Sequence, residues 1–120
     1  MNALVHTHSL HATVLACAHK PIPAFHYMVA VAGSDTIPCV PYHTFGSEAL
    51  SAAVVQALND RNACLLAHHG LVTAGATLAQ AMKIAIEIES LCEVYLKALA
   101  VAEPMRLSAA QMAEVLDKFK

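Results

Sequence analysis

The sequence predicts a small α/β or α+β domain in which a sheet is flanked by helices. Short apolar segments bounded by turn residues alternate with longer segments whose apolar residues recur at helical spacing. Patterns typical of helix starts precede several of the longer segments. The chain has 120 residues, the length of one ordinary domain, and shows neither an internal repeat nor a linker. We therefore expect a single domain over residues 1–120.

The short apolar segments are expected to be strands. They cover residues 1–8, 36–42, 63–67 and 71–74. The second of them contains Pro38 and Pro41, which cannot donate a hydrogen bond to a neighbouring strand, so it is at best an edge strand. The last two segments are joined by a reversal through Gly70.

The longer segments are expected to be helices. They cover residues 10–19, 48 to about 59, 78 to about 102, and 109–119. Ser9 and Ser47 can cap the first two, while Thr77 and Ser108 each begin a capping-box pattern with a glutamine three residues later. Residues 24–32 are apolar enough for a helix or a strand, and we favour a short helix. One apolar face of the long helix contains residues at helical spacing, namely Leu78, Met82, Ala85, Ile88, Cys92, Tyr95 and Leu99.

The composition limits the possible classes of function. Hydrophobic residues make up 58% of the chain and charged residues 13%, whereas typical domains have roughly 25% charged residues. A domain with so many apolar residues is expected to bury some of its apolar surface against another subunit or a further part of the chain. The net charge of −2 and the scattered basic residues argue against nucleic-acid binding. No apolar run is long enough for a membrane span, and the N-terminus does not resemble a signal peptide.

The cysteines indicate the compartment. They are Cys17, Cys39, Cys64 and Cys92, which are far apart and form no C-x-x-C motif. Most of them have apolar neighbours in the sequence, so we expect reduced and largely buried thiols. This pattern favours a cytoplasmic protein.

Histidine is unusually frequent, with 8 residues, and two clusters stand out: Val5-His6-Thr7-His8-Ser9 and His68-His69-Gly70. Alternation along a strand directs His6 and His8 to the same face, whereas the neighbours His68 and His69 point apart. Either His68 or His69 can therefore join the pair, and the spacing does not say which. Three imidazoles with an open position suit a catalytic zinc ion, and the alternative is a set of hydrogen-bonded strand histidines. Gly70 allows a close backbone approach and can adopt a positive φ.

The remaining histidines near these clusters are given supporting roles. His11 either packs or supports a metal ligand. His19 lies at the C-terminal end of its predicted helix, where a cation is favourable. His68 is expected to point into the fold or toward neighbouring side chains rather than to the metal.

Several motifs, taken in order, resemble those of the class II aldolase/adducin family. They are His6-Thr7-His8-Ser9, Pro23-Ala24-Phe25-His26-Tyr27-Met28, Ile37-Pro38-Cys39-Val40-Pro41-Tyr42, Thr44-Phe45-Gly46 and Leu65-Leu66-Ala67-His68-His69-Gly70-Leu71. Within this family they are most similar to the fuculose-phosphate aldolases. The resemblance covers nearly the whole chain and implies a class II aldolase-like sheet flanked by helices, here lacking its N-terminal strands.

The resemblance implies roles for particular residues. Family members bind one Zn²⁺ through three histidines, which correspond to His6, His8 and His69. The zinc stabilises the enediolate of dihydroxyacetone phosphate, and the enzyme cleaves a sugar 1-phosphate such as L-fuculose 1-phosphate into dihydroxyacetone phosphate and an aldehyde. A tyrosine from a neighbouring subunit, thought to protonate the aldehyde oxygen, corresponds to Tyr27, for which packing at the interface is the alternative role. Family members are tetramers with the active site between subunits, so a homotetramer is expected.

The chain also departs from the family pattern. In the family, the glutamate that serves as base and the loops that hold the phosphate lie upstream of the His-x-His strand, so this chain is expected to be an N-terminally truncated C-terminal portion. Its own glutamates lie on predicted helices, where solvated or capping roles explain them. One alternative is a metal-binding but catalytically inactive fragment or oligomerisation domain, as the adducin heads are. Another is a related pentulose-phosphate epimerase or dehydratase.

Overall fold

The structure, a computed structural model, describes residues 2–120, and a mixed four-stranded sheet forms its centre. The strands are β1 (Ala3–Thr7), β2 (Cys39–Val40), β3 (Ala63–Leu66) and β4 (Gly70–Gly75), in the order β1-β4-β3-β2. β4 pairs antiparallel with both β1 and β3, and β2 runs parallel to β3. The sheet flanked by helices is confirmed. The proline-containing segment contributes only a two-residue strand at the sheet edge, as the missing N–H donors require.

The helices agree with the predicted segments. They are α1 (Leu10–Cys17), the 3₁₀-helix η1 (Tyr27–Ala32), α2 (Glu48–Ala57), α3 (Leu78–Val101) and α4 (Ala109–Lys118). The hydroxyls of Ser47, Thr77 and Ser108 each accept a hydrogen bond from a backbone N–H in the first turn of their helix. The reciprocal bond of a capping box forms only at Ser108. At the start of α3, the side chain of Gln80 accepts from the N–H of Ala76 instead.

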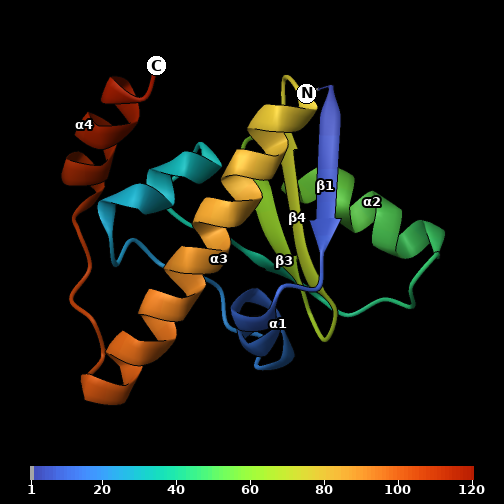
Figure 1. The fold of residues 1–120 in the computed structure, drawn as a ribbon, viewed down its shortest axis with the longest axis horizontal. Coiled ribbons are helices and arrows are strands. Elements are labelled where there is room, and N and C mark those ends of the chain that lie inside the picture. Colours follow the sequence, from blue (N-terminus) through green and yellow to red (C-terminus); the bar gives the residue numbers. More distant parts are fainter. Residues whose placement is uncertain (1) are drawn as a thin grey trace.

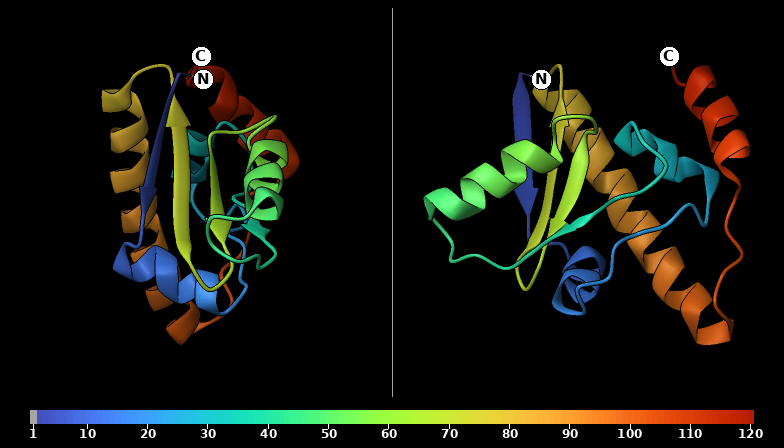
Figure 2. Two further views of the ribbon diagram at one scale, coloured as in Figure 1. Left: turned by 90° about the vertical axis from the view of Figure 1, so that its right-hand side faces the viewer. Right: turned by 180° about the vertical axis from the view of Figure 1, so that it is seen from behind.

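The helices cover both faces of the sheet. Figure 1 shows α3 crossing one face, with α1 at the end of the sheet where β1 finishes, and Figure 2 shows α2 on the opposite face. Side chains of β3 and β4 alternate between two apolar cores: Leu65 and Leu71 belong to the core beneath α3, whereas Leu66 and Val72 belong to the core beneath α2. Both central strands are therefore buried throughout, which explains why their sequences are apolar almost throughout and do not alternate with polar residues.

The buried face of α3 differs from the predicted one at the start of the helix. Leu78 and Met82 are 65% and 45% exposed, and Ala81 and Ile84 are buried instead. The cause is a close approach of the helix to the sheet, because a Cβ added at Gly75 would lie 2.7 Å from the backbone nitrogen of Ala81. This contact turns the side of the helix that contains Ala81 and Ile84 toward the sheet and leaves the side that contains Leu78 and Met82 in solvent.

Candidate metal centre

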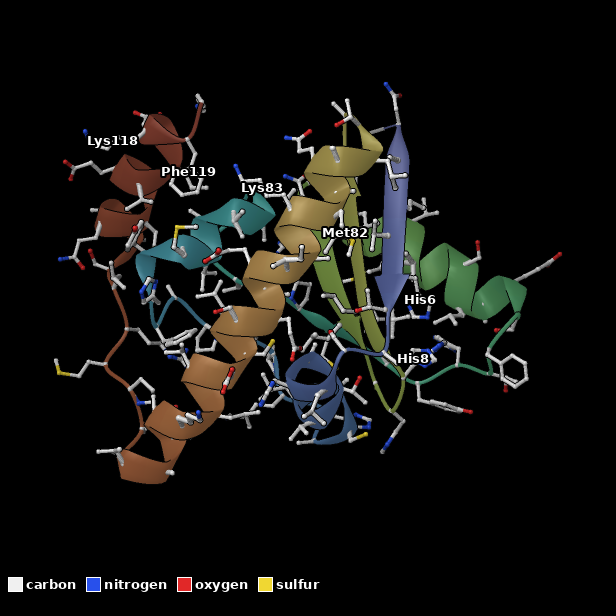
Figure 3. The ribbon with its side chains drawn as sticks, in the orientation of Figure 1. His6, His8, Met82, Lys83, Lys118 and Phe119 are labelled. Atoms are coloured by element: carbon white, nitrogen blue, oxygen red, sulfur yellow. The ribbon has the colours of Figure 1, made fainter. Side chains whose placement is uncertain are left out.

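The candidate metal centre lies where the end of β1 meets the start of β4. The register pairs His6 with Val72 and Thr7 with Leu71, so the end of β1 lies beside the turn that precedes β4. His8 follows β1 directly, and Figure 3 shows His6 and His8 together at this end of the strand. His69 is the last residue before β4. Three histidines from two distant parts of the sequence are thus brought to one corner of the sheet.

The three imidazoles face one another. One ring nitrogen from each of His6, His8 and His69 lies within 4.8 Å of the other two. The Nε2 atoms of His6 and His69 are 3.1 Å apart, and each pair of rings has centroids between 4.7 and 5.0 Å apart. His6 and His8 are exposed and His69 is partly buried, so an ion can reach the cluster from solvent. Within residues 2–120, no carboxylate joins this group.

Hydrogen bonding prepares His6 to ligate a metal through Nε2. Its Nδ1 lies 2.9 Å from the carbonyl oxygen of Leu71. Because a carbonyl only accepts, Nδ1 must carry the proton, and the lone pair then lies on Nε2, which faces His69. Metal-binding histidines are commonly oriented by a bond of this kind. Burial lowers the pKa of His69, and the neighbouring His6 and His8 lower it further, so its imidazole is neutral at pH 7. This donor set fits a divalent transition ion.

The turn before β4 separates the two neighbouring histidines. His68 has a φ of 58°, and its Nε2 lies 2.7 Å from Nε2 of His19, on α1's C-terminal side. The structure therefore brings His69, not His68, to His6 and His8. The expectation that Gly70 can supply a positive φ is wrong, since the left-handed residue of this turn is His68. The predicted close approach at Gly70 is confirmed, because an added Cβ would lie 2.2 Å from the carbonyl oxygen of Thr7.

A cavity of about 310 Å³ opens beside the cluster. It is lined by His6 and His69, by apolar residues of the sheet, and by Ser47 and Ser51 at the start of α2. A larger cavity of about 650 Å³ lies between η1, α3 and α4, where Figure 3 labels Lys83, and none of the three histidines lines it. The chemistry is concentrated at the smaller cavity, which has room for a small polar molecule next to the imidazoles.

Glu89 of α3 fixes the segment that follows His8. Its carboxylate accepts hydrogen bonds from the backbone N–H groups of His11 at 3.0 Å and Ala12 at 2.9 Å, and it lies 2.7 Å from Nδ1 of His11. Ser9 occupies the predicted cap position of α1, but its side chain makes no capping bond. A residue of another helix therefore caps α1. Burial alone would raise the pKa of Glu89, but these hydrogen bonds together outweigh it and lower the pKa below its ordinary value of 4.5.

We predict that Glu89→Gln lowers the free energy of unfolding at pH 7 by about 1–3 kcal/mol, because an amide cannot accept both backbone bonds without turning its NH₂ toward a donor. The folded-state pKa of Glu89 is depressed, so its stabilisation is present above about pH 4.5 and is lost as the pH falls through the folded-state value. Urea unfolding at pH 7 and under acidic conditions should therefore show the two proteins converging in acid. The matched control is Glu87→Gln on the same helix, which we expect to unfold like the wild type. Equal stability of the Glu89 variant at pH 7 would contradict the capping role.

Tyr27 is not part of the cluster within one chain. It begins η1, is 51% exposed, and stacks on His26 with ring centroids 5.0 Å apart. η1 lies between α3 and α4, whereas β1 lies on the other side of α3 (Figure 1). A role in the site therefore requires a second chain, and this role stays a prediction.

The fold defines the class of protein. A mixed four-stranded sheet flanked by helices corresponds to the class II aldolase fold. In a solved structure of an L-fuculose 1-phosphate aldolase, 54% of that chain aligns with 97% of this one, at a TM-score of 0.93 and 36% identity.

The profile of the class II aldolase and adducin N-terminal domain matches residues 1–96. The 5-methylthioribulose-1-phosphate/5-deoxyribulose-1-phosphate aldolase of Rhodospirillum rubrum is 52% identical over 120 residues, which are 54% of that protein. The L-fuculose phosphate aldolase of Haemophilus influenzae is 52% identical over 119 residues, or 55% of its length. The chain belongs to the class II aldolase and adducin family, and it spans about half the length of the curated relatives it matches.

Proposed function

We propose that this chain is the metal-binding portion of a class II aldolase, in which His6, His8 and His69 hold Zn²⁺ for the cleavage of a sugar 1-phosphate such as L-fuculose 1-phosphate into dihydroxyacetone phosphate and an aldehyde. The observation that carries this proposal is the convergence of three imidazole nitrogens within 4.8 Å. Relatives named as aldolases of fuculose phosphate and of methylthioribulose or deoxyribulose phosphates support a lyase that acts on a phosphorylated sugar.

The spacing of one imidazole pair, His6 and His69, supports zinc. With Zn–N bonds of 2.0–2.1 Å, two nitrogens in a tetrahedral site are about 3.3 Å apart, and the Nε2 atoms of His6 and His69 are 3.1 Å apart. When bound, the ion would act as a Lewis acid that withdraws charge from the oxygens of the reacting ketose phosphate. The Leu71 carbonyl holds the ring of His6 in the ligating orientation, and the adjoining cavity provides space for the substrate.

Proton transfer requires groups beyond the three histidines. Tyr27 of a neighbouring subunit is proposed to protonate the aldehyde oxygen, which accords with its exposure on η1.

Exposed apolar side chains on β1 and α3, namely Leu4, Leu78, Met82 and Ile86, support burial against another chain, and we propose a homotetramer. The four cysteines are free, and burial raises the pKa of Cys64 and Cys92 to about 12, which makes these two thiols unreactive and accords with a cytoplasmic protein. Cys17 is exposed, contrary to the expectation of buried thiols. Among the described residues, no helix is both long and apolar enough to cross a membrane.

A second candidate is a domain that binds metal and associates with other chains but does not catalyse the reaction. The observation that favours it is the absence of any carboxylate from the cluster within residues 2–120, because enediolate formation needs a base.

An assay of aldol cleavage distinguishes the two candidates. The zinc-loaded chain is incubated with L-fuculose 1-phosphate or 5-deoxyribulose 1-phosphate, and dihydroxyacetone phosphate is measured through its enzymatic reduction. The aldolase hypothesis predicts release that disappears in His8→Ala and persists in the control His43→Gln, since His43 lies outside the cluster. Bound zinc without any product, at high protein concentration, would instead support the inactive domain.

A further inference from the structure

A second pair of imidazoles lies outside the candidate metal centre. The Nε2 atoms of His19 and His68 are 2.7 Å apart, and both side chains are exposed. Their ring centroids are 4.5 Å apart, with the rings edge-on at 71°. His19 follows the C-terminal end of α1, and His68 lies in the turn between β3 and β4. The proposed aldolase chemistry uses neither residue.

Both histidines are held in a backbone conformation that side chains disfavour. Their φ angles are 52° for His19 and 58° for His68, in the left-handed region where glycine is the usual residue. At His19 this conformation ends α1, because the N–H groups of His19 and Lys20 bond to the carbonyls of Ala16 and Leu15. The N–H of His68 bonds to the same Ala16 carbonyl at 3.1 Å. Two residues in unfavourable conformations thus present their imidazoles to each other, an arrangement that is common where side chains have a function.

The distance between the two nitrogens indicates which ion fits. For metal–nitrogen bonds of about 2.0–2.1 Å, a separation of 2.7 Å corresponds to an N–metal–N angle of about 82°. This angle is near the 90° of neighbouring ligands in square-planar or octahedral complexes, and tetrahedral zinc would need the nitrogens about 3.3 Å apart. The ring of Tyr42 lies edge-on to His68, with centroids 5.9 Å apart, and restricts its orientation.

We propose that His19 and His68 form a second metal site, which takes a late divalent transition ion of square-planar or octahedral preference, Cu²⁺ or Ni²⁺. The site is separate from the histidine triad because His68 and His69 point in different directions from adjacent positions. A bound ion would connect the end of α1 to the β3–β4 turn. The same turn contains His69, and α1 follows His8 in the chain, so the second site would restrain the frame that holds the first.

The test uses the full chain with His6→Ala and His8→Ala, which removes the triad and leaves the pair. Titration with Cu²⁺, followed by calorimetry and electron paramagnetic resonance, should show one equivalent bound with hyperfine splitting from two imidazole nitrogens. Adding His19→Gly should weaken binding by at least about 10-fold. Glycine accepts the local φ without strain, so this variant should fold, as circular dichroism will check.

Two further variants make the result decisive. His68→Gly removes the other imidazole and should cause the same loss as His19→Gly, whereas His43→Gln removes a histidine outside both clusters and should leave Cu²⁺ binding unchanged. Retention of full Cu²⁺ affinity in either glycine variant, or no Cu²⁺ binding in the chain that lacks only the triad, would overturn the proposal. Because no sugar phosphate is present, these outcomes do not depend on aldolase activity.

Discussion

Replacement of His69 by alanine is expected to reduce zinc affinity by about 100-fold or more. The loss of a residue that only supports a metal ligand can already reduce affinity by about this factor. His69 is the member of the triad that comes from the β3–β4 turn, and its Nε2 faces that of His6 at 3.1 Å. Without it, two imidazoles remain at the end of β1, a donor set too small for tight binding of zinc. Competition with a chromophoric chelator measures the change in affinity.

The adjacent residue offers a matched control for this prediction. His68→Asn removes an imidazole one position away, and asparagine tolerates the local φ of 58°. We expect the tight zinc site to keep its affinity in this variant, because His68 faces His19 instead of the triad. The opposite pattern, with zinc lost in His68→Asn and kept in His69→Ala, would show that the triad is wrongly assigned.

Replacement of Gly70 by alanine is expected to lower the free energy of unfolding by about 3 kcal/mol and to weaken zinc binding in the same protein. The added Cβ would lie 2.2 Å from the carbonyl oxygen of Thr7 and 3.2 Å from Cδ2 of His8. A backbone atom cannot move aside as a flexible side chain can, so β1 and β4 must separate where the three histidines meet. Urea denaturation and zinc titration of one preparation measure both effects.

Gly46→Ala separates this steric effect from the loss of glycine's conformational freedom. Gly46 has a φ of 75°, and no atom lies within 4 Å of a Cβ added there. We therefore expect a smaller loss, about 1 kcal/mol, that arises only from the left-handed backbone. In Gly70→Ala the loss of stability has the other cause. The φ of Gly70 is not positive, so the loss arises from the contact of the added atom with Thr7. If the two variants were equally stable, the close approach at Gly70 would not limit the packing of the strands.

Most of the secondary structure could be predicted because the signals that specify it are local. Ser47 and Ser108 bond to N–H groups three residues later, within the first helical turn. Pro38 and Pro41 restrict the second strand to the sheet edge through the donors they lack. Such interactions depend on residues that are neighbours in the chain, so they can be recognised in the sequence without knowledge of the rest of the fold.

Which side of α3 is buried depended on its packing against the sheet. Helical spacing indicated an apolar row through Leu78 and Met82, but the adjacent row through Ala81 is also apolar. The contact between Ala81 and Gly75 selects the second row, and nothing in the periodicity of α3 itself encodes that contact. The segment 24–32 shows a similar limit, since its apolar residues suited either a helix or a strand and formed the 3₁₀-helix η1.

For the candidate site, too, local sequence predicted some features and the fold decided the others. Strand alternation was enough to direct His6 and His8 to one face, because side chains two positions apart point the same way. The choice between His68 and His69 depended on the left-handed backbone of the turn, which sends His68 toward His19 and His69 toward the pair. Glu89, which caps α1 across 78 residues, has no local signal. Residue types and short-range order thus specify the elements and the chemical groups, whereas strand pairing and helix packing decide which groups meet, because distant parts of a chain become neighbours only on folding.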